Sequence, residues 1–238
     1  MKKIVFLGDS ITDAYHNFGV DDKGLGDGYV GCIDRKLNKI EEKVKILNKG
    51  HDGFTIQGLK RCLFQDCILQ KPDVVSILIG CNDVGVMMNT GRTLEQQGFR
   101  ENYEKVIREI RWQTDAEIIC MAPFIFPYPA KYANWIPAIR ETEEIVRDIA
   151  GIYKLSFLAL HDELQEAAEK YGYNAVTVDG IHLTRMGAEI VAELWMKAIG
   201  DRVNLKRDRV NPSGDGVFLE KPRPHLTNPG KSVSIASK

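Results

Sequence analysis

The sequence predicts an α/β protein, a three-layer α/β/α sandwich built around a central parallel sheet. Short apolar runs rich in β-branched residues recur along the chain, and longer stretches with the periodicity of a helix separate them. Strands that alternate with helices are typical of a parallel sheet that carries helices on both faces. We therefore expect the flavodoxin-like strand order 2-1-3-4-5.

Five segments are expected to be strands, and the stretches between and after them are expected to be helices. The predicted strands are residues 3–7, 44–47, 74–79, 117–121 and 155–160. The predicted helices are residues 29–40, 55–69, 94–111, 139–150 and 184–199. Thr184 is in the position of an N-cap for the last of these, and His161 is expected to open a further helix.

We expect one domain at residues 1–200 and an extended tail at residues 201–238. The 238 residues exceed a typical domain but fit one α/β domain with an extension. From Asp201 onward the apolar periodicity fades, and four prolines fall among Gly, Ser, Lys and Arg residues. Such a segment fits a disordered end and equally an arm that wraps the domain or a neighbouring subunit, so both interpretations stay open.

The charge balance argues against several classes of partner. The 32 Lys and Arg residues nearly cancel the 33 Asp and Glu residues, and no long block of one sign occurs. Binding to nucleic acid or to a membrane is therefore not expected, and the balance suits a small neutral substrate. The first apolar run stops at Gly8, too short for a signal peptide, and no run is long enough to span a membrane. A cytoplasmic location is the resulting expectation.

Signals for a metal site or a disulfide framework are absent from the sequence. The five cysteines lack the paired spacing of disulfide scaffolds and zinc sites. No HExxH motif, Cys-x-x-Cys pair or Asp-rich calcium loop occurs. We expect reduced, mostly buried thiols, no metal and no cofactor. The cysteines are Cys32, Cys62, Cys67, Cys81 and Cys120.

Four polar or glycine-bearing segments occupy the places where chemistry is expected in such a fold, beyond the carboxyl ends of the strands. They are residues 8–12 (Gly-Asp-Ser-Ile-Thr), 48–53 (Asn-Lys-Gly-His-Asp-Gly), 80–83 (Gly-Cys-Asn-Asp) and 179–182 (Asp-Gly-Ile-His). Each alone is a weak signal, because short polar turns often only cap helices. Their occurrence together, with complementary roles, favours a catalytic site.

Ser10 is the candidate nucleophile. It is expected at a tight strand-to-helix turn that Gly8 permits, where a helix N-terminus favours developing negative charge. A serine hydroxyl needs a general base within hydrogen-bond reach and a third group that orients this base. His182 and Asp179, three residues apart, can supply both. The sequence therefore predicts a catalytic triad of Ser10, His182 and Asp179.

Three donors are candidates for an oxyanion hole, which stabilises the tetrahedral intermediate of acyl transfer. They are the backbone N–H groups of Ser10 and Gly53 and the side-chain amide of Asn82. Gly53 lets the backbone approach a ligand closely, and Asn82 carries an NH₂ donor on a short stem.

The four segments resemble the sequence blocks of the SGNH (GDSL) hydrolases, which supply Ser, Gly, Asn and His in this order. The similarity covers roughly residues 3–200. Residues 26–30, 71–80 and 122–124 are most similar to the branch that includes intracellular acetylxylan esterases. The resemblance implies a serine esterase that removes a short acyl group such as acetyl from a carbohydrate, and it implies a homo-oligomer.

Two departures from that branch concern the substrate pocket. Gly85 stands where the branch usually has tryptophan, and His51 and Asp52 replace an apolar residue and a serine before Gly53. Aromatic side chains in the loop after residue 121 could stack on a sugar ring, or they could pack the loop or a subunit contact. Histidines 16 and 51 lie near the motifs and are candidates for touching a substrate. The candidate substrate-binding residues are Asp9, Phe124 and Trp135.

Other functions with the same features stay open. The motifs specify acyl transfer and leave the leaving group undefined, so a lysophospholipase, a thioesterase or an arylesterase is an alternative. A non-enzymatic, receiver-like signalling module shares the layering, and Asp83 is a loose match to its phosphoacceptor. Such a module also needs a lysine after the fifth strand, where this sequence has His161 and Asp162.

Overall fold

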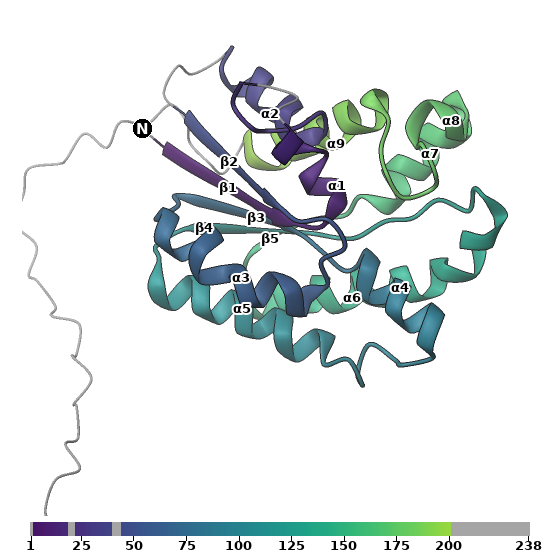
Figure 1. The fold of residues 1–238 in the computed structure, drawn as a ribbon, viewed down its shortest axis with the longest axis horizontal. Coiled ribbons are helices and arrows are strands. Elements are labelled where there is room, and N and C mark those ends of the chain that lie inside the picture. Colours follow the sequence, from purple (N-terminus) through teal and green to yellow (C-terminus); the bar gives the residue numbers. More distant parts are fainter. Residues whose placement is uncertain (1, 19–21, 40–43, 201–238) are drawn as a thin grey trace, which may run out of the picture. The chain divides into compact units, whose positions relative to one another are not determined.

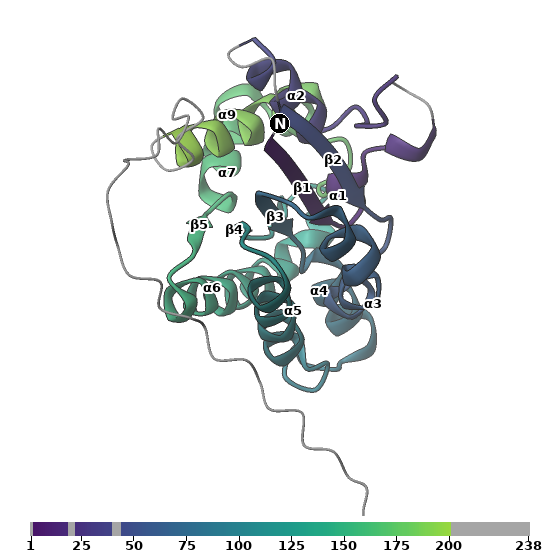
Figure 2. The same cartoon turned by 90° about the vertical axis from the view of Figure 1, so that its left-hand side faces the viewer.

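A computed structural model of the chain describes residues 2–18, 22–39 and 44–200. Its strands form one sheet of five parallel strands in the order β2-β1-β3-β4-β5. Helices lie on both faces of this sheet (Figures 1 and 2). The predicted three-layer class and strand order are confirmed. The extended tail expected at residues 201–238 lies outside the described residues.

The strands end level with one another at the edge where the site is expected. Gly8 is in register with Gly50 on one side and with Leu78 on the other, and Leu78 is in register with Met121. The segments that follow these strands therefore leave the sheet together, at its carboxyl edge. The strands are β1 (Lys2–Gly8), β2 (Val44–Gly50), β3 (Val74–Leu78), β4 (Glu117–Met121) and β5 (Ser156–Leu158).

Helices α2, α7 and α9 lie on one face of the sheet, and α3, α5 and α6 lie on the other (Figures 1 and 2). Other helical segments, among them α1, α4 and α8, connect these elements. The first layer contains α2 (Tyr29–Leu37), α7 (His161–Tyr171) and α9 (Arg185–Gly200). The second contains α3 (Ile56–Asp66), α5 (Phe99–Gln113) and α6 (Ile136–Tyr153). The connecting segments are α1 (Ser10–Asp13), η1 (His16–Phe18), η2 (Ile68–Gln70), α4 (Cys81–Thr90), η3 (Ala130–Trp135) and α8 (Tyr173–Val176).

Alternating side chains of β1 build a core on each face of the sheet. Phe6 belongs to the core beneath α2, α7 and α9, whereas Val5 and Leu7 belong to the core above α3, α5 and α6. In the first core the ring of Trp195 packs 5.3 Å from that of Phe6, and its indole N–H donates to Ser76 Oγ at 3.0 Å. This bond satisfies the buried indole N–H, and Ser76 Oγ donates in turn to Met121 Sδ at 3.1 Å.

The segment after β3 differs from the expectation. The sequence pattern predicted no helix between residues 69 and 94, but Cys81 and Asn82 lie in the first turn of α4. Helix α4 contains Gly85, a poor helix former, and is capped by Gly91, which has a φ of 75°. Cys81 is buried, as expected.

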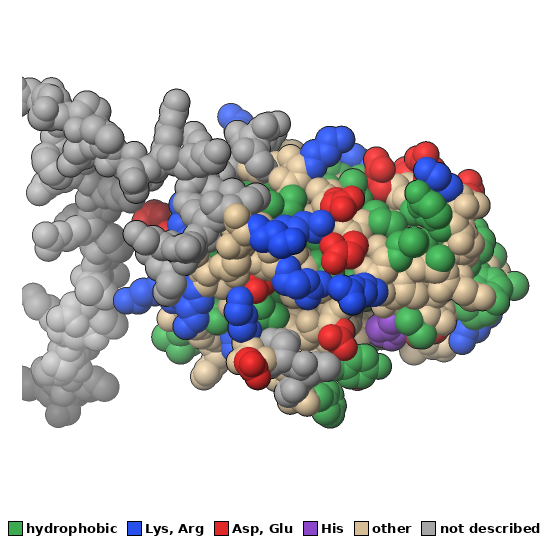
Figure 3. Space-filling model, turned by 90° about the horizontal axis from the view of Figure 1, so that it is seen from above, with side chains coloured by type: hydrophobic (Ala, Val, Ile, Leu, Met, Phe, Trp, Pro, Cys, Tyr) green, Lys and Arg blue, Asp and Glu red, His purple; other side chains and the backbone are tan. Residues whose placement is uncertain are grey.

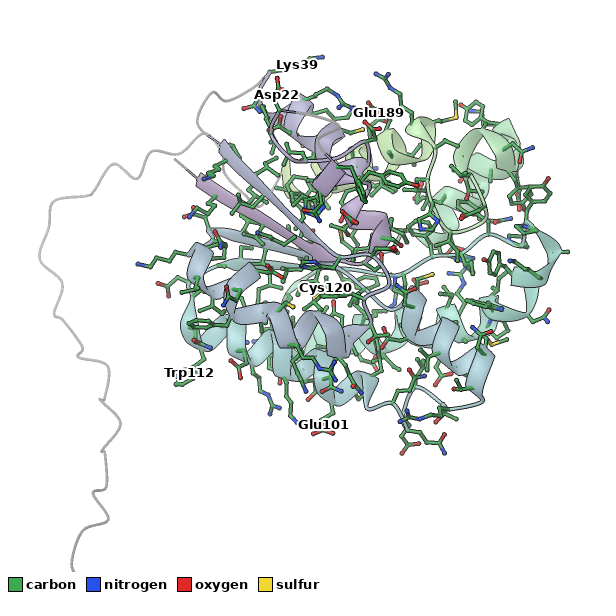
Figure 4. The ribbon with its side chains drawn as sticks, in the orientation of Figure 1. Asp22, Lys39, Glu101, Trp112, Cys120 and Glu189 are labelled. Carbon is green, nitrogen blue, oxygen red and sulfur yellow. The ribbon has the colours of Figure 1, made fainter. Side chains whose placement is uncertain are left out.

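The five cysteines are free thiols, and four of them are buried, which confirms the expected reduced and mostly buried state. Figure 4 shows Cys120 in the interior, beside the sheet. The predicted N-cap of the last helix is also present, because Thr184 Oγ1 accepts the backbone N–H of Gly187 at 3.3 Å.

The surface over α2 and α9 mixes the two signs of charge. Figure 3 shows Lys and Arg side chains interspersed with Asp and Glu on this face. Glu189 of α9 lies 3.4 Å from Arg35 and 3.2 Å from Lys36 of α2. Among the described residues, no helix is both long and apolar enough to cross a membrane.

Candidate active site

Ser10 lies directly after the carboxyl end of β1, at the first position of α1. Asp9 caps this short helix, since its Oδ1 accepts the backbone N–H of Ile11 at 3.0 Å. Close packing demands a glycine at position 8. A Cβ on Gly8 would lie 2.1 Å from Thr12 Oγ1 and 2.5 Å from a backbone oxygen of β3. A larger residue would push the serine turn away from the sheet.

Asp179 and His182 lie in a turn between α8 and α9. Thr177 holds the turn together, because its Oγ1 donates to the carbonyl oxygen of His182 and accepts the N–H of Gly180, both at 2.8 Å. Gly180 has a φ of 98°, and a Cβ there would lie 2.4 Å from the carbonyl oxygen of Tyr128. The turn therefore depends on a glycine, and it places the Asp179 carboxylate beside the His182 ring.

A continuous chain of hydrogen bonds joins Ser10, His182 and Asp179. Nε2 of His182 lies 2.9 Å from Ser10 Oγ, and Nδ1 lies 2.7 Å from Asp179 Oδ2. Because an ionised carboxylate only accepts hydrogen bonds, Nδ1 carries the proton and Nε2 is left to accept the hydroxyl of Ser10. The serine and the histidine are 172 positions apart, and the parallel sheet brings them to one edge.

The carboxyl group of Asp179 is stabilised in its ionised form. Its Oδ1 accepts the backbone N–H groups of Ile181 and His182 at 2.9 and 2.8 Å. Partial burial by itself would raise the pKa of Asp179, but the hydrogen bonds from the His182 side chain and from these two N–H groups outweigh it and lower the pKa. An ionised carboxylate at this place can orient an imidazole and stabilise its protonated form.

Gly53 and Asn82 approach from two other segments. Gly53 follows β2 with a φ of 71°, and no heavy atom lies within 4 Å of the position that its Cβ would occupy. The Nδ2 atom of Asn82 donates to the carbonyl oxygen of Phe54 at 3.0 Å. This bond ties the first turn of α4 to the loop that carries Gly53, and the second hydrogen of Nδ2 stays free for another acceptor.

Two buried carboxyl groups belong to the same motifs. Burial raises the pKa of Asp9 to about 7, and burial raises the pKa of Asp83 to about 7 as well. The Asp83 carboxylate accepts the backbone N–H of Ile56 at 3.1 and 3.3 Å, so a side chain of α4 caps α3. Sequence reasoning missed this role, because the capping residue lies 27 positions away from the helix that it caps.

A cavity of about 580 Å³ opens beside this arrangement. Ser10, Asp179 and His182 all line it, so the candidate nucleophile faces a space that can hold a ligand. Sequence reasoning found few of the other lining residues, because six of these thirteen lie in the segment between α1 and α2, which contains none of the four motif segments. The other lining residues include Asp13, Tyr15, Phe18, Asp27, Asp52 and Val178.

Comparison with known families decides the class of protein. The model of the GDSL-like Lipase/Acylhydrolase family matches residues 6–190, which contain every candidate catalytic and oxyanion-hole residue. The chain belongs to this family. The hydrolase is thus a serine carboxylic ester hydrolase, so the alternative prediction of a non-enzymatic, receiver-like signalling module is wrong.

Individual relatives agree with this assignment. The hydrolase is 30% identical over 215 residues to an acetylxylan esterase of Geobacillus stearothermophilus, across 84% of this chain and 94% of the relative. An acetylxylan esterase of Xylanibacter ruminicola is 27% identical across 83% of this chain, which spans 43% of that longer protein. A crystal structure of a catalytic mutant of the Geobacillus esterase superposes with a TM-score of 0.73 at 26% identity, covering 84% of this chain and 94% of the other. A GDSL-like lipase from Parabacteroides merdae superposes with a TM-score of 0.77 at 26% identity, covering 84% and 95%.

The structure does not bring the three candidate substrate-binding residues to the cavity of the hydrolase. Asp9 and Phe124 are each 1% exposed, so neither side chain is available to a ligand. The ring of Trp135 packs 5.0 Å from that of Tyr132 and lies 3.5 Å from the position that a Cβ on Gly85 would occupy. An indole from η3 thus fills the space beside Gly85.

Histidines 16 and 51 both pair with carboxylates near the cavity. Nδ1 of His16 bonds to Asp13 Oδ1. Nε2 of His51 lies 2.8 Å from Asp66 Oδ2, and its ring stacks on Phe54 with centroids 4.4 Å apart. His51 also lines the cavity. Both histidines therefore have partners within the protein.

Metal ligation finds little support in the part of the chain that the structure describes. No group of three or more His, Cys, Asp or Glu side chains is arranged there to hold a metal ion. The absence of a metal and of a cofactor stays a prediction, as do the cytoplasmic location and the homo-oligomer.

Proposed function

We propose that the hydrolase removes acetyl or similarly short acyl groups from a carbohydrate, with Ser10 as nucleophile, His182 as general base and acid, and Asp179 as the group that orients the base. The observation that carries this proposal is the chain of hydrogen bonds from Ser10 Oγ through His182 to Asp179, at the wall of a cavity. Serine, base and orienting carboxylate in this order are what an activated hydroxyl requires.

The reaction follows from this geometry in two steps. Nε2 of His182 takes the proton of Ser10 as Oγ attacks the acyl carbonyl carbon, and the same nitrogen then delivers the proton to the departing sugar oxygen. Water, activated by His182, attacks the acyl-serine and releases the carboxylic acid. Asp179, ionised and fixed by its backbone donors, stabilises the imidazolium that forms in each step.

The negative charge on the carbonyl oxygen needs donors that are already in place. We assign this role to the backbone N–H groups of Ser10 and Gly53 and to the free hydrogen on Asn82 Nδ2. The bond from Asn82 to Phe54 and the cap from Asp83 to Ile56 hold the two segments of this oxyanion hole against each other. Preorganised donors of this kind stabilise the intermediate without reorganising during the reaction.

Two considerations favour a short acyl group and a sugar. Catalytic mutants of the Geobacillus acetylxylan esterase replace a serine, an aspartate and a histidine, with the aspartate three residues before the histidine. Asp179 and His182 have the same spacing. In addition, no residue of the apolar run at 84–88 lines the cavity, so this run supplies no long aliphatic wall for a fatty acyl chain.

The test is a series of p-nitrophenyl esters from acetyl to palmitoyl together with an acetylated xylo-oligosaccharide. We expect kcat/KM to be highest for acetyl and low from octanoyl onward, with release of acetate from the sugar. A long-chain enzyme would instead gain up to about 0.8 kcal/mol for each methylene that it buries. A maximum at eight carbons or beyond, without deacetylation of the sugar, would favour the lysophospholipase, thioesterase or arylesterase alternatives.

A further inference from the structure

The cavity beside Ser10 has an aromatic wall that the fold does not need. Tyr15 and Phe18 line it with their rings 6.1 Å apart, yet they are 68% and 78% exposed. Large apolar side chains normally stabilise a protein by being buried, and these two are left in contact with water. An exposed aromatic pair at the wall of a reactive cavity is suited to covering a ligand.

The backbone that presents this wall is held in an unfavourable conformation. Ala14 and Tyr15 are consecutive non-glycine residues with φ values of 41° and 63°. The Ala14 carbonyl oxygen accepts the N–H of Asp27, and a Cβ on Gly26 would lie 2.4 Å from that same oxygen. The segment at 26–28 therefore packs tightly against the strained turn. Such strain persists where the surroundings enforce it, and it is frequent at ligand-binding sites.

Four of the side chains that line the cavity are carboxylates, beside Asn17 and two histidines. Asp13, Asp27, Asp52 and Asp179 line it, and none of its described lining residues is Lys or Arg. Carboxylates accept hydrogen bonds from hydroxyl groups, and they repel an anion in a cleft that excludes part of the solvent. The cavity therefore suits an uncharged group rich in hydroxyls.

We propose that Tyr15 and Phe18 form the platform on which the sugar ring of the leaving group stacks, and that Asp27 and Asp52 accept its hydroxyls and exclude anionic leaving groups. This inference rests on the proposed function and goes beyond it, because it assigns the residues that select the leaving group. It places the sugar site on the segment after α1, in contrast to our expectation for the loop after β4.

The first test compares kcat/KM for an acetylated xylo-oligosaccharide with kcat/KM for methyl acetate, whose leaving group has no ring to stack, in Phe18→Ala and Tyr15→Ala. We expect the ratio of the two values to fall about ten-fold or more, because stacking area is lost mainly for the sugar. Phe18→Trp keeps an aromatic face and should retain the ratio. Trp112→Ala is the matched control, since Trp112 is 84% exposed and points outward from α5, outside the cavity lining (Figure 4).

The second test uses phenyl acetate and 4-acetoxybenzenesulfonate, which differ by a negative charge on the leaving group. We expect the ratio of kcat/KM for phenyl acetate to kcat/KM for 4-acetoxybenzenesulfonate, with the native hydrolase, to exceed the ratio of the rates at which the two esters hydrolyse in alkaline water. This preference should shrink in Asp27→Asn/Asp52→Asn and at high salt, where charge repulsion is screened. A preference that is unchanged by both would contradict the role of these carboxylates.

The outcomes separate this inference from the proposed function. If Phe18→Ala, folded by circular dichroism, keeps the native substrate ratio, the platform is wrong. If it instead lowers the molecular mass measured by light scattering, the aromatic pair is a subunit contact and the platform is again wrong. Failure of the native hydrolase to cleave any ester, or retention of activity in Ser10→Ala, would contradict the proposed function itself.

Discussion

Three histidine–aspartate pairs stand near the cavity in the described part of the chain, and of these only His182–Asp179 reaches a serine. The ring of His182 is 2.7 Å from Asp179, and the ring of His51 is 2.8 Å from Asp66. In His182 the carboxylate binds Nδ1 and leaves Nε2 for Ser10, whereas in His51 the carboxylate binds Nε2 and the ring stacks on Phe54. The second ring nitrogen, and the group that it faces, therefore decides whether such a pair activates a nucleophile or anchors a loop.

Removal of the catalytic base should have the largest effect. His182→Ala leaves Ser10 without an acceptor for its proton, so we expect kcat for p-nitrophenyl acetate to fall by about 10⁴-fold or more. Stopped assays at high enzyme concentration, with circular dichroism to confirm folding, measure this loss. A loss below roughly ten-fold would show that another group serves as the base.

Removal of the orienting carboxylate should lower kcat somewhat less than removal of the base, and the His51–Asp66 pair provides the control. Asp179→Asn keeps the size of the side chain but favours the wrong tautomer of His182, so we expect kcat to fall by roughly 10³- to 10⁴-fold. Asp66→Asn makes the equivalent change beside His51 and should leave kcat within about ten-fold of the native value. A similar fall in kcat in Asp179→Asn and Asp66→Asn would show that the two pairs do not differ in function.

The buried acids give a prediction about stability and pH. Because burial raises the pKa values of Asp9 and Asp83 to about 7 from an ordinary 3.8, the folded protein binds more protons than the unfolded chain between these values. Stability should therefore fall as pH rises from about 4 to 7, by at most about 1.4 kcal/mol per pH unit for each acid.

The contribution of Asp83 to this dependence can be isolated. Asp83→Asn retains an oxygen that can accept the N–H of Ile56 but cannot ionise, so the decline in stability between pH 4 and 7 should become shallower. Urea unfolding at a series of pH values measures it. An unchanged slope would mean that the Asp83 carboxyl group titrates near its ordinary pKa.

The smallest effect is expected for the anchoring histidine. His51→Ala removes the bond to Asp66 and the stack on Phe54, which loosens the loop that carries Gly53, so we expect kcat to fall by roughly two- to ten-fold. His51→Gln retains a polar partner for Asp66 and should recover part of the loss. A loss as large as that of His182→Ala would instead place His51 in the proton transfer.

Much of the architecture follows from sequence pattern, because each strand is a short apolar run bounded by polar or glycine residues. Strand β1 places Ser10 at the carboxyl edge of the sheet, and the turn between α8 and α9 brings His182 to the same place, as the sequence motifs predicted. The expectation for Phe124 failed because the chain stays inside the protein after β4. Backbone bonds from Ala122 to Leu158 and from Phe126 to Gly180 hold that segment extended in the interior.

The aromatic wall and the cap from Asp83 could not be predicted from the sequence, for a different reason. The exposure of Tyr15 and Phe18 depends on two left-handed residues, a conformation that sequence seldom reveals outside glycine. The cap depends on the approach of α4 to α3, which are distant in sequence. Contacts between segments that are distant in the sequence can be identified only when the fold is known.

The activation of Ser10 is tested most directly by labelling the native hydrolase with a serine-directed organophosphorus reagent, followed by peptide mass spectrometry. We expect one phosphorylated residue, Ser10. His51→Ala should leave the rate of labelling within about ten-fold, and His182→Ala should lower it by about 10³-fold or more. Labelling of a different residue, or equal rates in the two histidine variants, would contradict the claim that His182 and Asp179 activate Ser10.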